Sequence, residues 1–132
     1  MGKETDPIPP ETNRISGQVV DSAMMVHTAL GPGLLESVYE TCLAFELENR
    51  GIKVQRQVPV GVKYKGVELE VGFRMDRLVG KTVVVELKAV EEILPIHEAQ
   101  LMTYLKLTGH RVGLLLNFNV VSMKKGLHRI VI

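Results

Sequence analysis

Two carboxylates and a lysine stand where a β-hairpin could bring them together. Asp76 lies on one segment of alternating apolar and polar residues, and Glu86-Leu87-Lys88 lies on the next. With a period of two, Glu86 and Lys88 share one face of their strand. If the register pairs Asp76 with Glu86, their Cβ atoms lie about 5 Å apart, close enough for both carboxylates to bind one hard cation. The hairpin therefore carries a candidate metal site, with Lys88 placed to orient a water or to balance charge on a phosphate oxygen.

The same pattern has an ordinary structural interpretation. Acidic and basic residues that alternate along a strand usually form only its solvated face, and Glu-x-Lys occurs by chance in many proteins. On spacing alone this ordinary interpretation is favoured. Two carboxylates this close repel each other unless a cation neutralises them, and a register slip of one residue would separate them. The register of the hairpin therefore decides between the two interpretations.

A third carboxylate and a polar helix face could complete such a site. Gly33, Glu36 and Tyr39 come at steps of three and lie on one side of the start of a predicted helix. Glu36 is accounted for by the helix dipole, which favours acidic residues in the first turn, or by a role as a third metal ligand. Periodicity leaves both open. Further along, Gln100 and Tyr104 share one polar side of another predicted helix with His97.

Hydrophobic periodicity predicts the helices that must position these residues. Residues 1–12 contain three prolines and are expected to form a flexible tail. Helices are predicted at 13–30, 34–49 and 97–107, each followed by a glycine, at 31, 51 and 109. The predicted buried stripes are Ile15, Val19, Ala23, Val26 and Leu30 on the first helix, and Leu35, Val38, Cys42 and Phe45 on the second.

Strands are predicted at 53–64, 67–76, 83–89, 111–118 and 127–132. On the second of these the apolar face is Val67, Leu69, Val71, Phe73 and Met75. Short connections favour an antiparallel meander of the first three strands. The nearly continuous apolar run at 111–118 predicts a strand buried on both faces, and the helix before it favours parallel pairing with an earlier strand. The expected fold is α/β (α+β), a mixed sheet flanked by helices in the order α-α-β-β-β-α-β-β.

Length and composition limit the class of protein. A chain of 132 residues suits a single domain, here 13–132 after the tail. The net charge of +1 neither indicates nor excludes nucleic-acid binding, because a local basic patch matters more than the sum. A single cysteine rules out an internal disulfide and favours a reducing cytoplasm. No apolar run reaches the roughly 18 residues of a membrane span, so no membrane partner is expected.

This ordered set of motifs resembles the PD-(D/E)XK nuclease superfamily. Within it, Gly33-Leu34-Leu35-Glu36-Ser37-Val38-Tyr39, Glu86-Leu87-Lys88 and the stretch from Pro95 to Gly109 resemble the GxxExxY family of small bacterial and archaeal proteins. The resemblance covers nearly the whole chain after the tail. Met75 stands where the superfamily name has a proline, at a position that varies among members.

The resemblance implies a restriction-endonuclease-like core and a role for each site residue. Asp76 and Glu86 would bind Mg²⁺ or Mn²⁺, with the Leu87 carbonyl as a further ligand, and Lys88 would position or activate the attacking water. Glu36 would add a helix carboxylate to the metal. Gln100 would match the helix glutamine of recombination nucleases, with Tyr104 one turn further on.

The function implied is hydrolysis of phosphodiester bonds in nucleic acid, with DNA favoured over RNA, by a protein that could act as a homodimer to address two strands. Two alternatives stand beside it, because fold carries over further than activity. One is a catalytically silent module of nuclease fold that binds nucleic acid. The other is a protein-interaction module whose paired carboxylates are only a solvated strand face.

Overall fold

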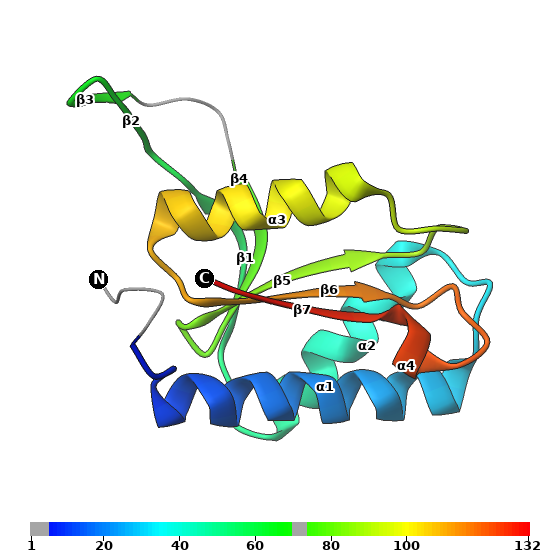
Figure 1. The fold of residues 1–132 in the computed structure, drawn as a ribbon. Helices are drawn as coiled ribbons and strands as arrows, with labels where there is room; N and C mark the ends of the chain where they lie inside the picture. The colour runs from blue at the N-terminus through cyan, green and yellow to red at the C-terminus, as the bar shows by residue number, and fades with distance from the viewer. Residues whose placement is uncertain (1–5, 70–73) are drawn as a thin grey trace.

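A five-stranded mixed sheet with helices on both faces forms the body of the protein (Figure 1). The computed structural model describes residues 6–69 and 74–132. The elements are α1 (Pro10–Leu30), α2 (Glu36–Asn49), β1 (Val54–Pro59), β2 (Val62–Tyr64), β3 (Val67–Leu69), β4 (Arg74–Val79), β5 (Val83–Lys88), α3 (Pro95–Thr108), β6 (Val112–Asn117), α4 (Met123–Gly126) and β7 (Leu127–Val131). This architecture confirms the predicted fold class and is consistent with a restriction-endonuclease-like fold.

The strand order in the sheet is β1-β4-β5-β6-β7. β1, β4 and β5 form an antiparallel meander, and β7 is antiparallel to β6. β6 runs parallel to β5, because α3 carries the chain back across the sheet before β6 begins. All six residues of β6 are buried, as the apolar run predicted. Parallel pairing brings the carboxyl ends of β5 and β6 to the same edge, where Lys88 lies opposite Asn117.

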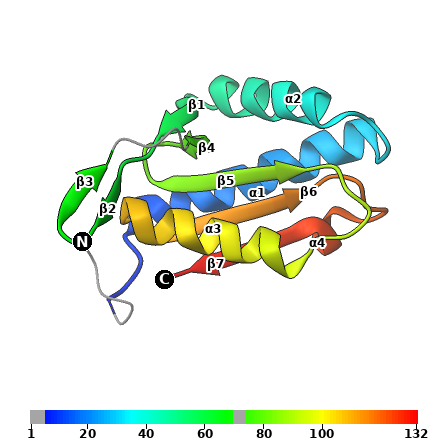
Figure 2. The same ribbon diagram turned by 90° about the horizontal axis from the view of Figure 1, so that it is seen from above.

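The sheet divides the core into two layers, and Figure 2 shows α3 in front of the sheet and α1 behind it. α1 and α2 pack on one sheet face, where alternate residues of β5 (Val83, Val85 and Leu87) meet Val19 and Leu43. α3 covers the other face, where Val84 meets Leu101 and Leu105. The period of two along β5 therefore sends Glu86 and Lys88 toward the α3 side. Among the described residues, no helix is long and apolar enough to cross a membrane.

Two predicted strands are each broken into two. The segment 53–64 forms β1 and β2, and the segment 67–76 forms β3 and β4, so that β2 and β3 pair as a separate two-stranded sheet. Pro59, which pairs with Arg74 at the end of β1, lacks the N–H needed to continue the ladder. Val67 and Leu69 are consequently 56 % and 42 % exposed and do not face the core, whereas Met75 is buried as predicted. Val71 and Phe73 lie outside the described residues.

The first helix begins at Pro10, three residues earlier than predicted. Proline suits the first helical turn, because the missing N–H would have no partner there. Thr12, placed by the sequence in a flexible tail, is buried and shares a hydrogen bond with Thr82. The predicted stripe on α1 is buried from Ile15 to Val26, but Leu30, at the last residue of the helix, is 38 % exposed.

The predicted buried face of α2 is wrong. The residues buried on this helix are Tyr39, Leu43, Ala44 and Leu47, whereas Leu35 and Phe45 are 75 % and 65 % exposed. α2 has apolar residues on two sides, so periodicity could not tell which side meets the sheet. Val38 is 37 % exposed, and Cys42 is half-buried.

The sequence did not predict α4, a four-residue helical turn between β6 and β7. Its last residue, Gly126, lies against the end of β6, where a Cβ atom would come within 2.0 Å of the Asn117 carbonyl oxygen. Only glycine permits this close approach of two backbones. The turn therefore packs directly on the carboxyl end of β6.

Candidate active site on the β4–β5 hairpin

Asp76 and Glu86 lie side by side on β4 and β5. The register Arg77↔Val85, Leu78↔Val84 and Val79↔Val83 places them opposite each other when it is continued by one step. The Asp76 backbone N–H donates to Glu86 Oε1 at 3.5 Å. The structure thus brings together the two carboxylates on which the sequence argument depends. Glu86 is only 5 % exposed, and Asp76 is half-buried.

This pairing changes how Glu86 titrates. Burial, together with a side-chain hydrogen bond to Asp76 and the negative charge of Asp76, raises the pKa of Glu86 from 4.5 to about 8, whereas the Asp76 backbone N–H and the charge of Lys88 lower it. Near neutral pH the pair therefore holds a proton and carries less than two negative charges. A divalent cation could take the place of that proton, and the carboxylate oxygens are the donors that Mg²⁺ and Mn²⁺ prefer. The two carboxylates therefore supply donors of suitable chemistry for such an ion.

Lys88 and Leu87 complete the Glu86-Leu87-Lys88 triplet on β5. Lys88 is half-buried and close enough to Glu86 for its charge to lower the pKa of that carboxyl. The Leu87 side chain is fully buried in the core on the α1 and α2 side. Only the backbone of Leu87 is therefore available to the site.

Of the predicted α3 residues, Tyr104 lies near the carboxylates, and Gln100 lies one helical turn before it. Burial, with the charges of Glu86 and Asp76, raises the pKa of the Tyr104 hydroxyl, which places Tyr104 within electrostatic reach of both. Gln100 is exposed and lines a hollow on α3 with Ile96 and Tyr104. His97 has a different use, because its Nδ1 accepts a hydrogen bond from the Leu94 N–H at 3.0 Å and caps the helix.

Glu36 does not join the carboxylate pair. It is exposed in the first turn of α2, and the part of the chain that the structure describes holds no group of three or more His, Cys, Asp or Glu side chains arranged to hold a metal. Glu36 does influence Arg77: burial lowers the pKa of Arg77, whereas the charges of Glu86 and Glu36 raise it. Arg77 points to the α2 side of the sheet, where it forms an ion pair with Glu40.

The segment from Gly33 to Tyr39 connects the start of α2 to the end of β6 through contacts of Tyr39. The Tyr39 hydroxyl donates to the Gly31 carbonyl at 2.6 Å and accepts from the Leu34 N–H at 3.1 Å. Its ring stacks on Phe118 with centroids 4.7 Å apart. Gly33 has φ of 94°, a conformation that favours glycine. Glycine and tyrosine thus shape the loop before Glu36, although Tyr39 is fully buried and Glu36 is exposed.

Asn117 is a site-adjacent residue that the sequence argument missed. Its side chain is 2 % exposed and holds both backbone groups of Val90, accepting from the N–H at 3.1 Å and donating to the carbonyl at 2.9 Å. The Phe118 N–H also donates to the Lys88 carbonyl at 3.0 Å. These bonds fix the chain just after Lys88. The feature of the sequence that could have identified Asn117 is a polar residue at the end of an otherwise wholly apolar strand.

Comparison with known proteins agrees with this geometry. The sequence profile of the PD-(D/E)XK nuclease superfamily matches residues 13–130, and the chain belongs to this superfamily. No curated protein and no solved structure matches the chain.

Proposed function

We propose that this protein is a divalent-metal-dependent nuclease that hydrolyses phosphodiester bonds in nucleic acid, DNA in preference to RNA. The observation that carries the proposal is the pairing of Asp76 with Glu86, with Lys88 two residues further along the same face of β5. Membership of a nuclease superfamily supports this class of reaction. The loop built by Gly33 and Tyr39 supports the GxxExxY family as the particular group.

Each residue of the hairpin would have a distinct role in the reaction. Asp76 and Glu86 would hold Mg²⁺ or Mn²⁺ through carboxylate oxygens, and Glu86 would give up its proton as the ion binds. The bound ion supplies charge neutralisation at the phosphate and an acidified water. Leu87 would offer its carbonyl as a further ligand. Lys88 would hold the attacking water in place and stabilise the negative charge that develops on the phosphate oxygens.

The helices would add contacts from both sides of the sheet. Gln100, exposed on α3, would hydrogen-bond a phosphate or the attacking water, and Tyr104 would donate a hydrogen bond at the same place. Glu36, exposed in the first turn of α2, would be the further carboxylate ligand that the resemblance implies.

The distribution of charge supports a nucleic-acid substrate. From Lys53, just before β1, to Arg74, the first residue of β4, the sequence has five Lys and Arg residues against two Glu, a net charge of +3, whereas the whole chain has +1. All five basic side chains are exposed. This stretch precedes Asp76 in the chain and supplies exposed positive charge that a phosphate backbone could contact.

The test is cleavage of labelled single-stranded, double-stranded and branched DNA, and of RNA, in Mg²⁺, Mn²⁺ or EDTA. We expect the wild type to cut DNA in either metal and to be inactive in EDTA. Lys88→Ala and the Asp76→Ala, Glu86→Ala double variant should lose at least about 100-fold in rate, because each removes charge stabilisation that acts at the transition state.

Matched controls separate this loss from general damage. Lys106→Ala removes an exposed lysine from α3, and the Glu91→Ala, Glu92→Ala double variant removes two exposed carboxylates just beyond Lys88. Both should keep wild-type rates. A wild type that cuts none of these substrates with either metal would argue strongly against a nuclease.

One observation favours a second candidate function, a catalytically silent nucleic-acid-binding module. Within residues 6–69 and 74–132 no third carboxylate joins Asp76 and Glu86, so the site has fewer metal ligands than the resemblance implies. Such a module would bind DNA with a steep salt dependence, and Lys88→Ala would leave that affinity unchanged.

A further inference from the structure

One side of the protein carries large apolar side chains that its own chain leaves exposed. Six of them, from the C-terminal half of α1, the α1–α2 connection and α2, are between 37 % and 75 % exposed: Met25, Leu30, Leu34, Leu35, Val38 and Phe45. We call this set the α1–α2 apolar surface. Single exposed apolar residues are normal, but a contiguous group of this size marks an interaction site.

The surface is contiguous because it surrounds one hollow between the two helices. Met25, Ala29 and Leu30 line the hollow from α1, and Cys42 and Phe45 line it from α2. Leu35 and Val38 continue the same side of α2, since residues three and four apart lie on one face of a helix. This is the stripe that periodicity predicted to be buried.

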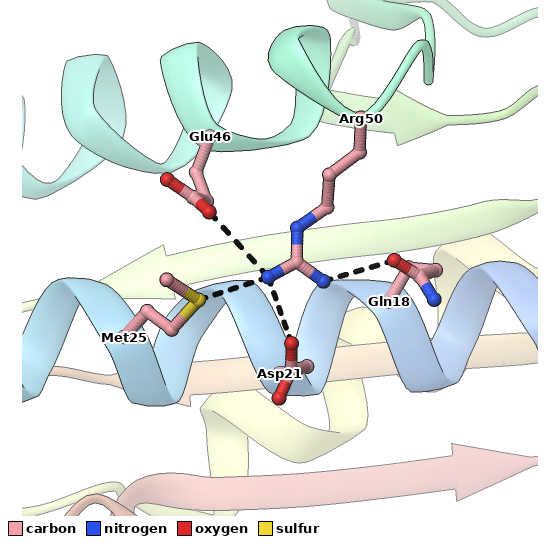
Figure 3. A network of polar contacts seen from close by, with 5 residues as sticks. All are labelled: Gln18, Asp21, Met25, Glu46 and Arg50. Atoms are coloured by element: carbon pink, nitrogen blue, oxygen red, sulfur yellow. Dashed lines mark hydrogen bonds and ion pairs between the residues drawn. The ribbon is translucent and has the colours of Figure 1, made fainter.

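A polar network holds the two walls of the hollow together (Figure 3). Arg50, at the end of α2, forms ion pairs with Asp21 at 2.7 Å and Glu46 at 3.4 Å, and donates to Gln18 Oε1 at 2.9 Å. The hollow is therefore preformed. Glu46 is the only charged side chain among the described residues that line it, and Arg50 pairs with it.

We propose that the α1–α2 apolar surface is a homodimer interface, with a second copy of this chain as its occupant. The exposed fractions of the six side chains add up to about three fully exposed ones, or roughly 500 Å². One side of a standard interface buries about 800 Å², of which about 60 % is apolar, so the patch supplies the apolar area that one side of a dimer needs.

Charge and shape also favour self-association. In a two-fold interface the same surface is buried on both copies, so an unpaired charge on it would lose its water twice. The hollow presents no such charge, because Glu46 is already paired. The Phe45 side chain is 65 % exposed at the rim of the hollow and could insert into the hollow of the partner copy. The inference does not depend on nuclease activity.

The first experiment measures the mass of the protein by sedimentation velocity over a wide range of concentration. We expect the wild type to reach the mass of two 14.7 kDa chains and to dissociate on dilution. Phe45→Glu and Leu35→Glu should be monomeric throughout, while Tyr64→Glu, which alters a 61 % exposed residue on β2, should remain dimeric. A wild type that is monomeric throughout, or a folded Phe45→Glu variant that still dimerises, would overturn the proposal.

The second experiment needs no variant. Cys42 is the only cysteine of the chain and lines the hollow, so its alkylation rate reports whether the surface is covered. We expect the rate to fall about tenfold when about nine-tenths of the chains are dimeric. A dimer that leaves Cys42 equally reactive at every concentration would place the interface elsewhere and refute the assignment.

Discussion

At the scale of single residues, buried polar side chains hold the backbone next to the candidate site. Asn117 bonds both backbone groups of Val90, and its Oδ1 also accepts the Asn119 N–H at 3.2 Å. The Tyr39 hydroxyl likewise holds the loop before Glu36, because it bonds the Gly31 carbonyl and the Leu34 N–H. An apolar residue of the same size could pack at either position but would leave these backbone groups unpaired. Their role is to position the residues that touch substrate or metal.

Replacing Asn117 with leucine should damage both stability and the site. Three half-buried backbone groups, two of Val90 and one of Asn119, lose their partner, so we expect the free energy of unfolding to fall by about 2–4 kcal/mol. Because the chain after Lys88 is released, Mn²⁺ affinity measured by calorimetry well below the unfolding temperature should fall about tenfold. Asn49→Leu, at the exposed end of α2, is the control. Wild-type stability and Mn²⁺ affinity in Asn117→Leu would show that these bonds are dispensable.

At the scale of elements, the β2–β3 hairpin is the least supported part of the fold. It projects from the body, away from α1 (Figure 1). Lys65 and Gly66 form its turn with φ of 50° and 77°, which is the backbone of a tight two-residue hairpin loop. An isolated two-stranded hairpin is marginally stable, so contact with a partner molecule would stabilise its folded form. A two-stranded ribbon also has the width that the DNA major groove accepts.

Removing positive charge from this hairpin should weaken DNA binding. Lys63→Ala with Lys65→Ala removes two exposed charges, and the slope of log affinity against log salt should decrease by up to about 2. Fluorescence anisotropy of a labelled duplex in EDTA measures this without cleavage. The matched control is Lys124→Ala with Lys125→Ala on α4. If both double variants bind as the wild type does, the hairpin makes no contact with phosphates.

At the scale of the whole molecule, buried Glu86, paired with half-buried Asp76, couples the stability of the fold to pH. Glu86 faces Asp76 on β4, Lys88 on its own strand and Tyr104 on α3, and Arg77 acts on it electrostatically. Its folded pKa of about 8 lies above its ordinary value of 4.5. The folded state therefore keeps a proton that the unfolded chain releases between these values. The contribution of Glu86 to stability is full below pH 4.5 and is lost as pH rises to about 8.

Glu86→Gln should remove this dependence. The amide stays neutral, so we expect the variant to be more stable than the wild type at pH 9, and the difference should shrink toward pH 4.5. Urea unfolding followed by circular dichroism across this range measures the effect, with the exposed Glu91→Gln as control. Mn²⁺ should stabilise the wild type more as pH rises, because its binding releases the Glu86 proton. Parallel pH profiles for Glu86→Gln and wild type would contradict the assigned pKa.

The sequence by itself determined the elements with a clear local signal. The apolar run from Val112 predicted a strand buried on both faces, and Gly109, with φ of 77°, closes α3 where a C-cap was expected. Alternation along β5 predicted that Glu86 and Lys88 share a face. These features depend on residues that are close together in the chain, so they can be predicted from the local pattern of apolar and polar residues. For Asp76 and Glu86 the spacing alone favoured a solvated strand face, and it was the resemblance of the ordered motifs that indicated the superfamily and a metal site.

Only the tertiary structure decided which of two apolar faces is covered and which distant residues meet. α2 is apolar on the side of Leu43 and on the side of Phe45, and only packing against the sheet selects the first. The register that joins Asp76 to Glu86, and the bonds from Asn117 to Val90, link residues far apart in the chain. Local propensity cannot specify such contacts, because their free energy arises only when separate elements pack together.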